Sequence, residues 1–297
     1  MDNEPNWEWY RTFLSVYEAG SLSGAGRALG LTQPTVGRHI DSLETALGLR
    51  LFTRTYDGYA PTEAAAQLQP YAASVAATAS ALRRVASSIG AGVRGTVRIT
   101  ASAVIGIEVL PPVLATLRAA HPVLVVELVL SNAVDDLLRR EADIAVRMVR
   151  PTQDALVAKR IGTIEIGLFA HHRYLDAHGT PDSMAALAGH ALIGYDQETA
   201  PVRAWLDRFP AFARAGLALR CDSDVAQLGA IRAGVGIGWC QVGLAARDPG
   251  LVRLLADDCS LPLETWVAMH EDLRASPRCA ATFAALAAGL HDYLAAT

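Results

Sequence analysis

The sequence lacks the features that define several large classes of protein. No apolar run in its 297 residues approaches the roughly 18 residues that a membrane-spanning helix needs. The N-terminal MDNEPNWEWY lacks the basic-then-apolar order of a signal peptide. The formal net charge of -4 gives no bulk attraction to nucleic acid or to an anionic membrane. We therefore expect a soluble, cytoplasmic protein with no membrane partner.

Cysteine is scarce, and the few cysteines are not grouped. Cys221, Cys240, Cys259 and Cys279 include no CxxC pair and have no histidines at zinc-finger spacing. Buried small hydrophobic residues are the expected role, with a redox switch as the minor alternative. We expect no metal site.

The common catalytic motifs are also missing. The chain has no GxSxG elbow, no Walker loop, no HExxH and no GxGxxG after a strand. The glycine-rich run 234–238 is typical of a tight turn that enters a buried strand. We expect no cofactor and no catalytic residue. An α/β enzyme or solute-binding protein with an incidental helical N-terminus remains the alternative.

The first sixty residues have the pattern of short helices separated by glycines. Apolar residues at helical spacing predict a first helix that ends near Gly20. Ser21 or Ser23 is positioned to cap a second helix, and Thr32 to cap a third that runs to about Leu47.

The third helix has two different faces. One face is apolar (Val36, Ile40, Leu43, Leu47), and the opposite face is polar (Thr35, Arg38, His39, Ser42). Two short helices with a tight turn and such a face are typical of a helix-turn-helix, whose second helix enters the major groove of DNA. From periodicity alone, an ordinary solvated face is an equal alternative.

Residues 53–59 predict a small hairpin with an Asp-Gly turn. A hairpin after a recognition helix is a wing, and Arg54 is suited to contact phosphate or the minor groove from it.

A longer helix is expected from Thr62 onward. Its stripe follows steps of four and three, with only Thr78 polar (Ala64, Leu68, Tyr71, Val75, Thr78, Leu82, Val85, Ile89). An apolar heptad stripe favours a coiled-coil-like dimer seam, for which we select Leu68, Tyr71, Val75 and Leu82. Burial against the helix's own domain is the alternative.

Beyond the glycines at 90–95, apolar runs alternate with helical patterns. Strands are expected at 97–100, 123–130, 144–148, 164–170, 191–194, 217–221, 235–239 and 265–269, and helices at about 104–119, 132–141 and 278–294. This order indicates parallel βαβ units. The length favours two α/β lobes with a cleft between them.

These segments together resemble a known family. The run SLSGAGRALGLTQPTVGRHIDSLETALGLRLFTRT and the following PTEAAAQL resemble the N-terminal part of LysR-type transcriptional regulators. The segments GTVRITAS, LVAKRIGTIEIGLFAHHRYL and AIRAGVGIGWC resemble that family's effector-binding domain, in the same order.

The resemblance implies an α+β multidomain protein. It would have a winged helix-turn-helix over 1–61, a dimerising linker helix over 62–90 and a two-lobed, periplasmic-binding-protein-like domain over 91–297. Lobe I would comprise about 91–163 and 268–297, and lobe II about 164–267. The resemblance also implies a homodimer that assembles into a homotetramer, and transcription controlled by a small molecule. RNA polymerase is a further candidate partner.

Carried over position by position, the resemblance assigns DNA contacts to Thr32, Gln33, Thr35, Arg38 and the wing Arg54; helical spacing adds His39. Asp57 departs from the family, because many members have a basic residue there. Residues 1–60 hold fewer arginines than carboxylates, so one domain alone should bind double-stranded DNA weakly. We therefore expect two domains to read a pseudo-palindromic site.

Ligands of open α/β sheets bind beyond the carboxyl ends of the strands. Topology selects six residues there: Ser102, Ser131, Arg147, Tyr195, Thr199 and Ser223. The resemblance supports Ser102 best. Helix capping is the alternative for Ser131, Thr199 and Ser223, and pairing with Asp143 or Glu141 for Arg147. We expect the ligand to be an organic anion. Gln241 stands where the family usually has a proline.

Overall fold

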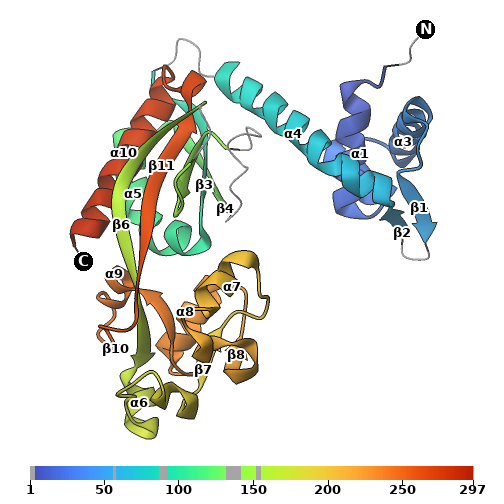
Figure 1. Cartoon of the computed structure of the whole chain (residues 1–297). Helices are drawn as coiled ribbons and strands as arrows, with labels where there is room; N and C mark the ends of the chain where they lie inside the picture. Colours follow the sequence, from blue (N-terminus) through green and yellow to red (C-terminus); the bar gives the residue numbers. More distant parts are fainter. Residues whose placement is uncertain (1–3, 56–57, 87–91, 132–141, 152–154, 297) are drawn as a thin grey trace. The chain divides into compact units, whose positions relative to one another are not determined.

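The structure is a computed structural model that describes residues 4–55, 58–86, 92–131, 142–151 and 155–296 (Figure 1). Its contacts divide the chain into two compact units. Of the described residues, those up to Arg83 belong to the first unit and all later ones to the second.

The first unit begins with three helices that end at glycines. These are α1 (Trp7–Ala19), α2 (Leu22–Leu29) and α3 (Gln33–Leu47). Gly20, Gly30 and Gly48 follow them with φ of 61°, 67° and 66°, the left-handed region that stops a helix at low cost for glycine. Of the two predicted caps for α2, Ser21 is the one used, since its hydroxyl accepts from the Gly24 amide. The predicted helices and their ends are confirmed.

The core of this unit is formed where the apolar faces of the three helices meet. Phe13, Val36 and Leu43 are fully buried there, together with Leu51. The hairpin follows as β1 (Phe52–Thr55) and β2 (Gly58–Pro61), with Arg54 opposite Tyr59. The predicted hairpin is confirmed; Asp57 lies outside the described residues.

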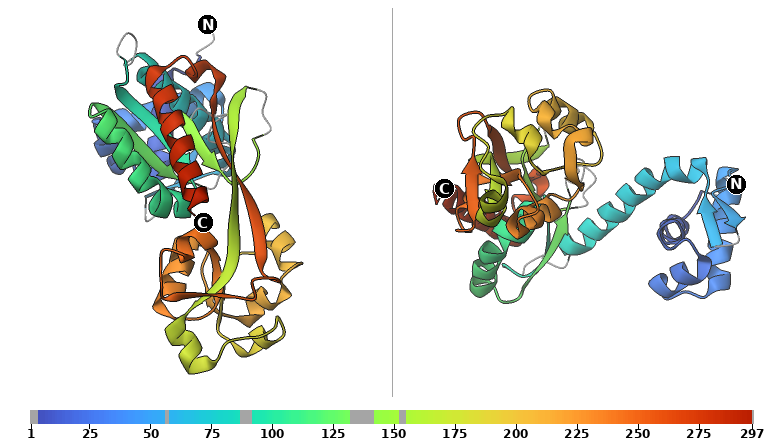
Figure 2. Two further views of the ribbon diagram at one scale, coloured as in Figure 1. Left: turned by 90° about the vertical axis from the view of Figure 1, so that its left-hand side faces the viewer. Right: turned by 90° about the horizontal axis from the view of Figure 1, so that it is seen from below.

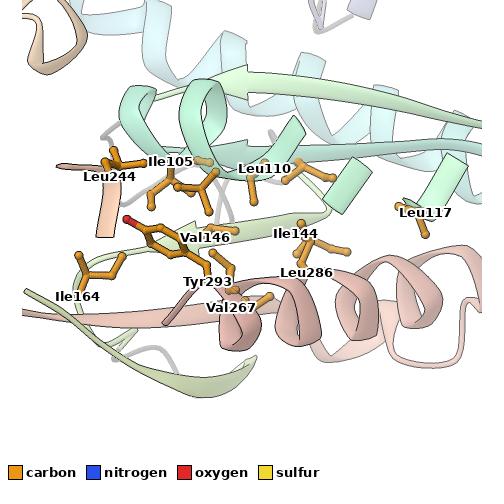
Figure 3. Close-up of a cluster of buried hydrophobic side chains, with 14 of the residues drawn as sticks. Ile105, Leu110, Leu117, Ile144, Val146, Ile164, Leu244, Val267, Leu286 and Tyr293 are labelled. Carbon is orange, nitrogen blue, oxygen red and sulfur yellow. The ribbon is translucent and has the colours of Figure 1, made fainter. Parts of the chain in front are cut away.

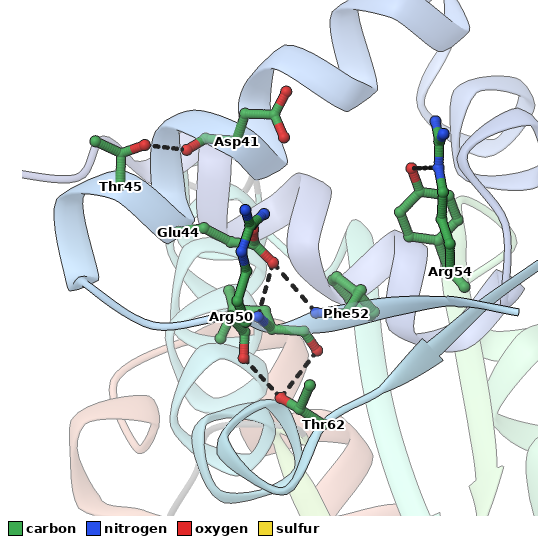
Figure 4. A network of polar contacts seen from close by, with 9 residues as sticks. Asp41, Glu44, Thr45, Arg50, Phe52, Arg54 and Thr62 are labelled. Atoms are coloured by element: carbon green, nitrogen blue, oxygen red, sulfur yellow. Dashed lines mark hydrogen bonds and ion pairs between the residues drawn. The ribbon is translucent and has the colours of Figure 1, made fainter.

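A buried carboxylate joins α3 to the hairpin (Figure 4). Glu44 is only 8% exposed; its Oε1 accepts from the amides of Leu51 and Phe52 at 2.7 and 3.2 Å. Its Oε2 accepts from the Arg50 guanidinium at 2.7 Å. The carboxylate thus gives two backbone amides an acceptor in a buried place, where an unsatisfied donor would be costly.

The next helix, α4 (Glu63–Ala86), is anchored to the same segment. The Thr62 hydroxyl donates to the carbonyl of Arg50 at 2.8 Å and accepts from the Ala65 amide in the first turn of the helix. Ala65 and Ala72 are buried against the core of the first unit. The first half of α4 is therefore part of that unit.

The second unit begins with a parallel sheet. β3 (Gly95–Ala101) pairs in parallel with both β4 (Leu124–Leu130) and β5 (Ile144–Arg147). A π-helical turn, η1 (Ile105–Val109), leads into α5 (Leu110–Ala120) between β3 and β4. The predicted βαβ arrangement is confirmed for this part, whereas the helix predicted at 132–141 lies outside the described residues.

Two long antiparallel strands run through the second unit (Figure 2). β6 (Leu156–His171) and β11 (Ser260–His270) pair along their lengths, with a register shift between Thr265 and Trp266. The strands predicted at 164–170 and 265–269 are only parts of them, and the predicted lobe limits fall inside them. The sequence concealed β6 because its first half includes the exposed, polar Lys159 and Arg160 in place of an apolar run.

The remaining elements form lobe II, which we define by them. They are α6 (His172–His178), η2 (Ala186–Gly189), β7 (Leu192–Gly194), α7 (Ala200–Leu206), η3 (Pro210–Phe212), η4 (Arg214–Gly216), β8 (Leu217–Arg220), α8 (Asp224–Ala233), β9 (Gly238–Gln241), α9 (Val242–Ala245) and β10 (Leu251–Leu254). β7 and β8 are parallel, and β9 and β10 pair with β6. The strand predicted at 235–239 begins only at Gly238, because the preceding residues turn at Gly234, with φ 78°. β10 was not predicted.

Lobe I comprises β3–β5, η1, α5 and the last helix, α10 (Pro277–Ala295), after η5 (Glu271–Leu273). Its core lies between the sheet and these helices (Figure 3). Ile144, Val267 and Leu286 are fully buried there. Among the described residues, no helix has both the length and the apolar composition needed to cross a membrane.

Three of the four cysteines are buried, as predicted. Burial raises the pKa of Cys240 to about 12 and that of Cys259 to about 11. Both thiols are therefore protonated at neutral pH, which disfavours the redox alternative for these two.

We expect Glu44→Ala to destabilise the first unit by about 2–4 kcal/mol, because two buried amides lose their acceptor. Calorimetric unfolding of the full chain should show a lower transition temperature for this unit and an unchanged transition for the second. Glu18→Ala, at an exposed position of α1, is the matched control. A Glu44→Ala protein as stable as this control would contradict the role given to the carboxylate.

Candidate functional site

The N-terminus of α3 presents a chain of polar side chains. Thr32 caps the helix, and its hydroxyl lies 2.8 Å from that of Thr35. The Arg38 guanidinium reaches the Thr35 hydroxyl at 3.5 Å. Thr32 and Arg38 are exposed and Thr35 is half-buried. The predicted grouping of these three residues on one helix end is therefore observed.

Gln33 and Arg54 lie along a groove between α3 and the hairpin. The groove has a volume of about 820 Å³, and Gln33, Asp41, Arg50 and Arg54 are among its polar lining residues. The Arg54 Nε donates to the Tyr59 hydroxyl at 3.1 Å, which raises the pKa of Arg54. This contact holds a wing cation in one position beside the helix (Figure 4).

His39 is placed differently from the prediction. Its Nδ1 lies 2.9 Å from the hydroxyl of Thr12, a fully buried residue of α1. The expectation of an exposed face is corrected for His39, because the 100° step from Arg38 turns this ring toward the neighbouring helix. The contact joins α1 to α3.

The apolar stripe of α4 divides into two parts. Leu68 packs against the core of the first unit, as the alternative to a dimer seam anticipated. Tyr71, Val75 and Leu82 are 74%, 53% and 69% exposed. Large apolar side chains in this state form an exposed apolar face. The side chain of Val85 and the whole of Ile89 lie outside the described residues.

The second unit contains a cleft of about 320 Å³ between its lobes. Its walls are Ser102, Val104, Met148, Ile166, Tyr195, Val202, Trp205, Asp224, Gln227, Leu228, Trp239, Cys240, Gln241, Leu244, Leu261 and Leu263. This volume is within the range of small-molecule sites. Most of the lining is apolar, and polar groups gather at a few points.

The polar groups of the cleft are held by hydrogen bonds. The Tyr195 hydroxyl donates to Asp224 at 2.6 Å, and burial together with this carboxylate raises the pKa of Tyr195. The Gln227 amide donates to the carbonyl of Cys221 at 2.6 Å. The Tyr293 hydroxyl donates to Gln241 at 2.7 Å, which ties the cleft to α10.

Of the six residues predicted for the ligand, the cleft includes Ser102 and Tyr195. Arg147 is not among the described lining residues; it is 7% exposed and donates to the Thr100 hydroxyl and to its neighbour's carbonyl, each at 3.0 Å. The structure therefore places the Arg147 guanidinium beside Thr100 inside the domain, and its contact with a ligand stays a prediction.

Ser131, Thr199 and Ser223 are likewise absent from the described lining. Ser223 caps α8 by accepting from the Ala226 amide, as its alternative anticipated. Thr199 occupies the N-cap position of α7 without a side-chain cap bond. Both are exposed.

The aromatic and acidic part of the cleft was not predicted. These lining residues come from three elements of lobe II: Trp205, Asp224, Gln227 and Trp239. Of them, Trp239 falls in a segment that resembles the family, but the pattern there predicted a strand and not a lining residue. Gln241 alone gave a signal, as a departure from the family pattern.

An ion pair links the lobes beside the cleft. Arg232 of α8 donates to both oxygens of Glu108 in η1, at 2.7 and 3.0 Å. This fork geometry is the strong form of a charge-assisted bond. The bond from Arg232 lowers the pKa of Glu108, against the opposing effect of burial.

Comparison with known proteins places these two units in one family. Residues 7–66 match the bacterial regulatory helix-turn-helix proteins of the lysR family. Residues 90–290 match the LysR substrate binding domain. The chain belongs to the LysR family.

Individual relatives are regulators. An HTH-type transcriptional regulator of Xanthomonas campestris pv. campestris is 32% identical over 169 residues, which are 57% of this chain and 49% of that protein. CrgA of Neisseria meningitidis serogroup C, also an HTH-type transcriptional regulator, is 28% identical over 192 residues, 65% of this chain and 64% of CrgA. The matched segments thus span less than two thirds of these relatives. Because both relatives are transcriptional regulators, the alternative that the chain is an enzyme is disfavoured.

Solved structures of regulators share the fold. The CrgA structure, from Neisseria meningitidis, is 24% identical, has a TM-score of 0.58 and covers 95% of this chain and 97% of its own. Full-length CbnR in complex with its target DNA is 18% identical, has a TM-score of 0.64 and covers 97% of this chain and 99% of its own.

We expect Glu108→Gln to lower the free energy of unfolding of the second unit by about 1–2 kcal/mol at pH 7, a range that allows for the partial exposure of the pair. The folded pKa of Glu108 is lowered, so its contribution is complete above the ordinary value of 4.5 and is lost as pH falls through the lowered pKa. Denaturant unfolding at pH 7 and pH 3 measures this change.

The control is Glu127→Gln, which removes an exposed pair with Arg98 and should cost less than about 1 kcal/mol. A Glu108→Gln effect that stays constant down to pH 3 would contradict the assignment.

Proposed function

We propose that this protein is a sequence-specific DNA-binding transcriptional regulator controlled by a small molecule. One observation carries the proposal: the segment that matches the family's helix-turn-helix presents Thr32, Gln33 and Arg38 at one exposed helix end, beside the wing Arg54. The N-terminal residues of such a helix contact base edges in the major groove.

Gln33 is suited to read adenine, and Arg38 to read guanine or to bind phosphate. Arg54 would contact phosphate or the minor groove from the hairpin. His39 would affect DNA binding indirectly, because its ring contacts α1 and so helps to hold α3 in position.

The protein would act as a homodimer that assembles into a homotetramer. Support comes from the exposed Tyr71, Val75 and Leu82 on one stripe of α4. Two recognition helices would read a pseudo-palindromic site, with half-sites about one helical turn or a multiple apart. Bound to its promoter, the regulator would act on RNA polymerase from within the cytoplasm.

The small molecule would bind in the cleft between the lobes and change their closure. A ligand shifts this equilibrium only if it binds one state more tightly than the other. The linkage between cleft and DNA is then a shift of populations and not a chemical reaction.

DNase footprinting upstream of the protein's own gene tests the proposal. Protection of a defined site by the full-length protein is expected. Turnover of a small molecule without DNA binding would overturn the proposed function in favour of an enzyme.

Arg38→Ala should weaken binding to the protected site by about 1–3 kcal/mol, with a smaller loss on random DNA, if Arg38 reads a base. Gel shifts with both DNAs measure the two losses. Arg11→Ala, at an exposed position of α1, should leave both affinities unchanged. Equal losses on the two DNAs would reduce Arg38 to a phosphate contact. Full affinity and site choice in Thr35→Ala would remove Thr35 from the interface.

Tyr71→Glu combined with Leu82→Glu should convert the protein to monomers, because charges replace apolar groups on the proposed seam. Both side chains are exposed within the chain, so each unit should keep its own stability. Sedimentation equilibrium measures the mass. Ala66→Glu, on the opposite side of α4, should leave the assembly intact, and an intact assembly in the double variant would contradict the seam.

A further inference from the structure

We propose that the cleft binds an uncharged, ring-bearing, largely apolar molecule with a single hydroxyl or similar hydrogen-bonding group, in place of the organic anion that the sequence suggested. The inference rests on the proposed function, because it treats the cleft as the effector site. It concerns the chemistry of the ligand, which the side chains of this chain determine.

The walls of the cleft favour an apolar ring. Aliphatic side chains from both lobes surround it: Val104, Ile166, Val202, Leu228, Leu244, Leu261 and Leu263. Trp205 and Trp239 add two indole rings whose centroids lie 5.5 Å apart at an interplanar angle of 79°. Such an edge-to-face pair offers both a ring face and a ring edge to an aromatic guest.

The charges of the cleft oppose an anion. Among the described residues that line it, the ionised side chain is a carboxylate, Asp224, and none is basic. Nearby arginines are committed elsewhere: Arg232 forks onto Glu108, and Arg147 is buried beside Thr100. Against these described walls, an anion would lose its hydration without gaining a cation.

A cation is also disfavoured, because the charge of Asp224 is already compensated. One of its oxygens accepts the Tyr195 hydroxyl at 2.6 Å. Asp224 is also the first residue of α8, a ten-residue helix whose N-terminus stabilises negative charge. An ammonium group would therefore gain little at Asp224 while losing water against apolar walls.

One end of the cleft offers hydrogen-bond partners to a polar group of a ligand. The Tyr195 hydroxyl uses its hydrogen for Asp224, so its oxygen remains an acceptor. Gln227 is 4% exposed and is positioned by its bond to the Cys221 carbonyl. A ligand hydroxyl placed at this end exchanges its hydrogen bonds to water for hydrogen bonds to the protein. The ring of the ligand meanwhile displaces water from the aliphatic and indole walls.

Isothermal titration calorimetry of the full-length protein with three ligands of one shape tests the inference. The probes are 2-naphthylmethanol, 2-naphthoate and 2-naphthylmethylammonium. We expect the alcohol to bind at least about tenfold more tightly than either ion, because each ion would bury a charge without a partner. A factor of about ten in affinity is the smallest penalty that we expect for such a charge. Tighter or equal binding of either ion, or no saturable binding of the alcohol, would overturn the inference.

Two variants locate the binding. Trp205→Leu should weaken binding of the alcohol by about tenfold or more, because it removes a ring that lines the cleft. Trp266→Leu is the matched control, since Trp266 lies outside the lining residues and should leave the affinity unchanged. Circular dichroism checks that both variants fold. Equal affinities in the two variants would place the alcohol outside the cleft and overturn the inference.

Gel shifts on the same preparations separate this inference from the proposed function. Specific DNA binding together with a preference for 2-naphthoate overturns the ligand class and leaves the regulator intact. If the unaltered protein does not bind DNA specifically, the proposed function as a regulator is overturned, whatever the order of affinity for the three ligands.

Discussion

The buried carboxylate of Glu44 is the interaction on which the geometry of the first unit depends. It receives two backbone amides at the start of the hairpin and the guanidinium of Arg50. Thr62 then ties the start of α4 to the same backbone segment. Because one carboxylate and one hydroxyl connect α3, hairpin and α4, the polar end of α3 is held in a defined position relative to Arg54. A DNA-reading surface requires such a fixed relation between helix and wing.

In the second unit, residues of both lobes line the cleft, so the position of one lobe relative to the other determines the shape of the cleft. β6 and β11 run through both, and the Glu108–Arg232 pair connects them beside the cleft. The polar end of the cleft continues through Gln241 to Tyr293 on α10. A ligand bound there would meet polar groups that are already fixed by their own partners, which lowers the ordering cost of binding.

Local structure in this chain was largely predictable, because its signals are local. Gly20, Gly30 and Gly48 end three helices, and Ser21 and Thr32 begin two of them. Glu44 gave no signal, because its partners lie seven and eight residues further along the chain. Arg147 shows the opposite case, a residue with a sequence signal whose surroundings the sequence does not predict. Its place at a strand end suggested a ligand contact, while the packing around it made it a buried partner of Thr100.

By itself, the sequence determined the helix-turn-helix, the hairpin, the parallel strands and the family, because capping, periodicity and motif spacing are properties of neighbouring residues. Only the tertiary structure decided what the cleft contains. Trp205, Asp224 and Trp239 are separated in the chain and meet through the packing of α7, α8 and β9. Charge and shape in a cleft arise from such meetings, and among the described lining residues they bring together mostly apolar side chains and the carboxylate of Asp224.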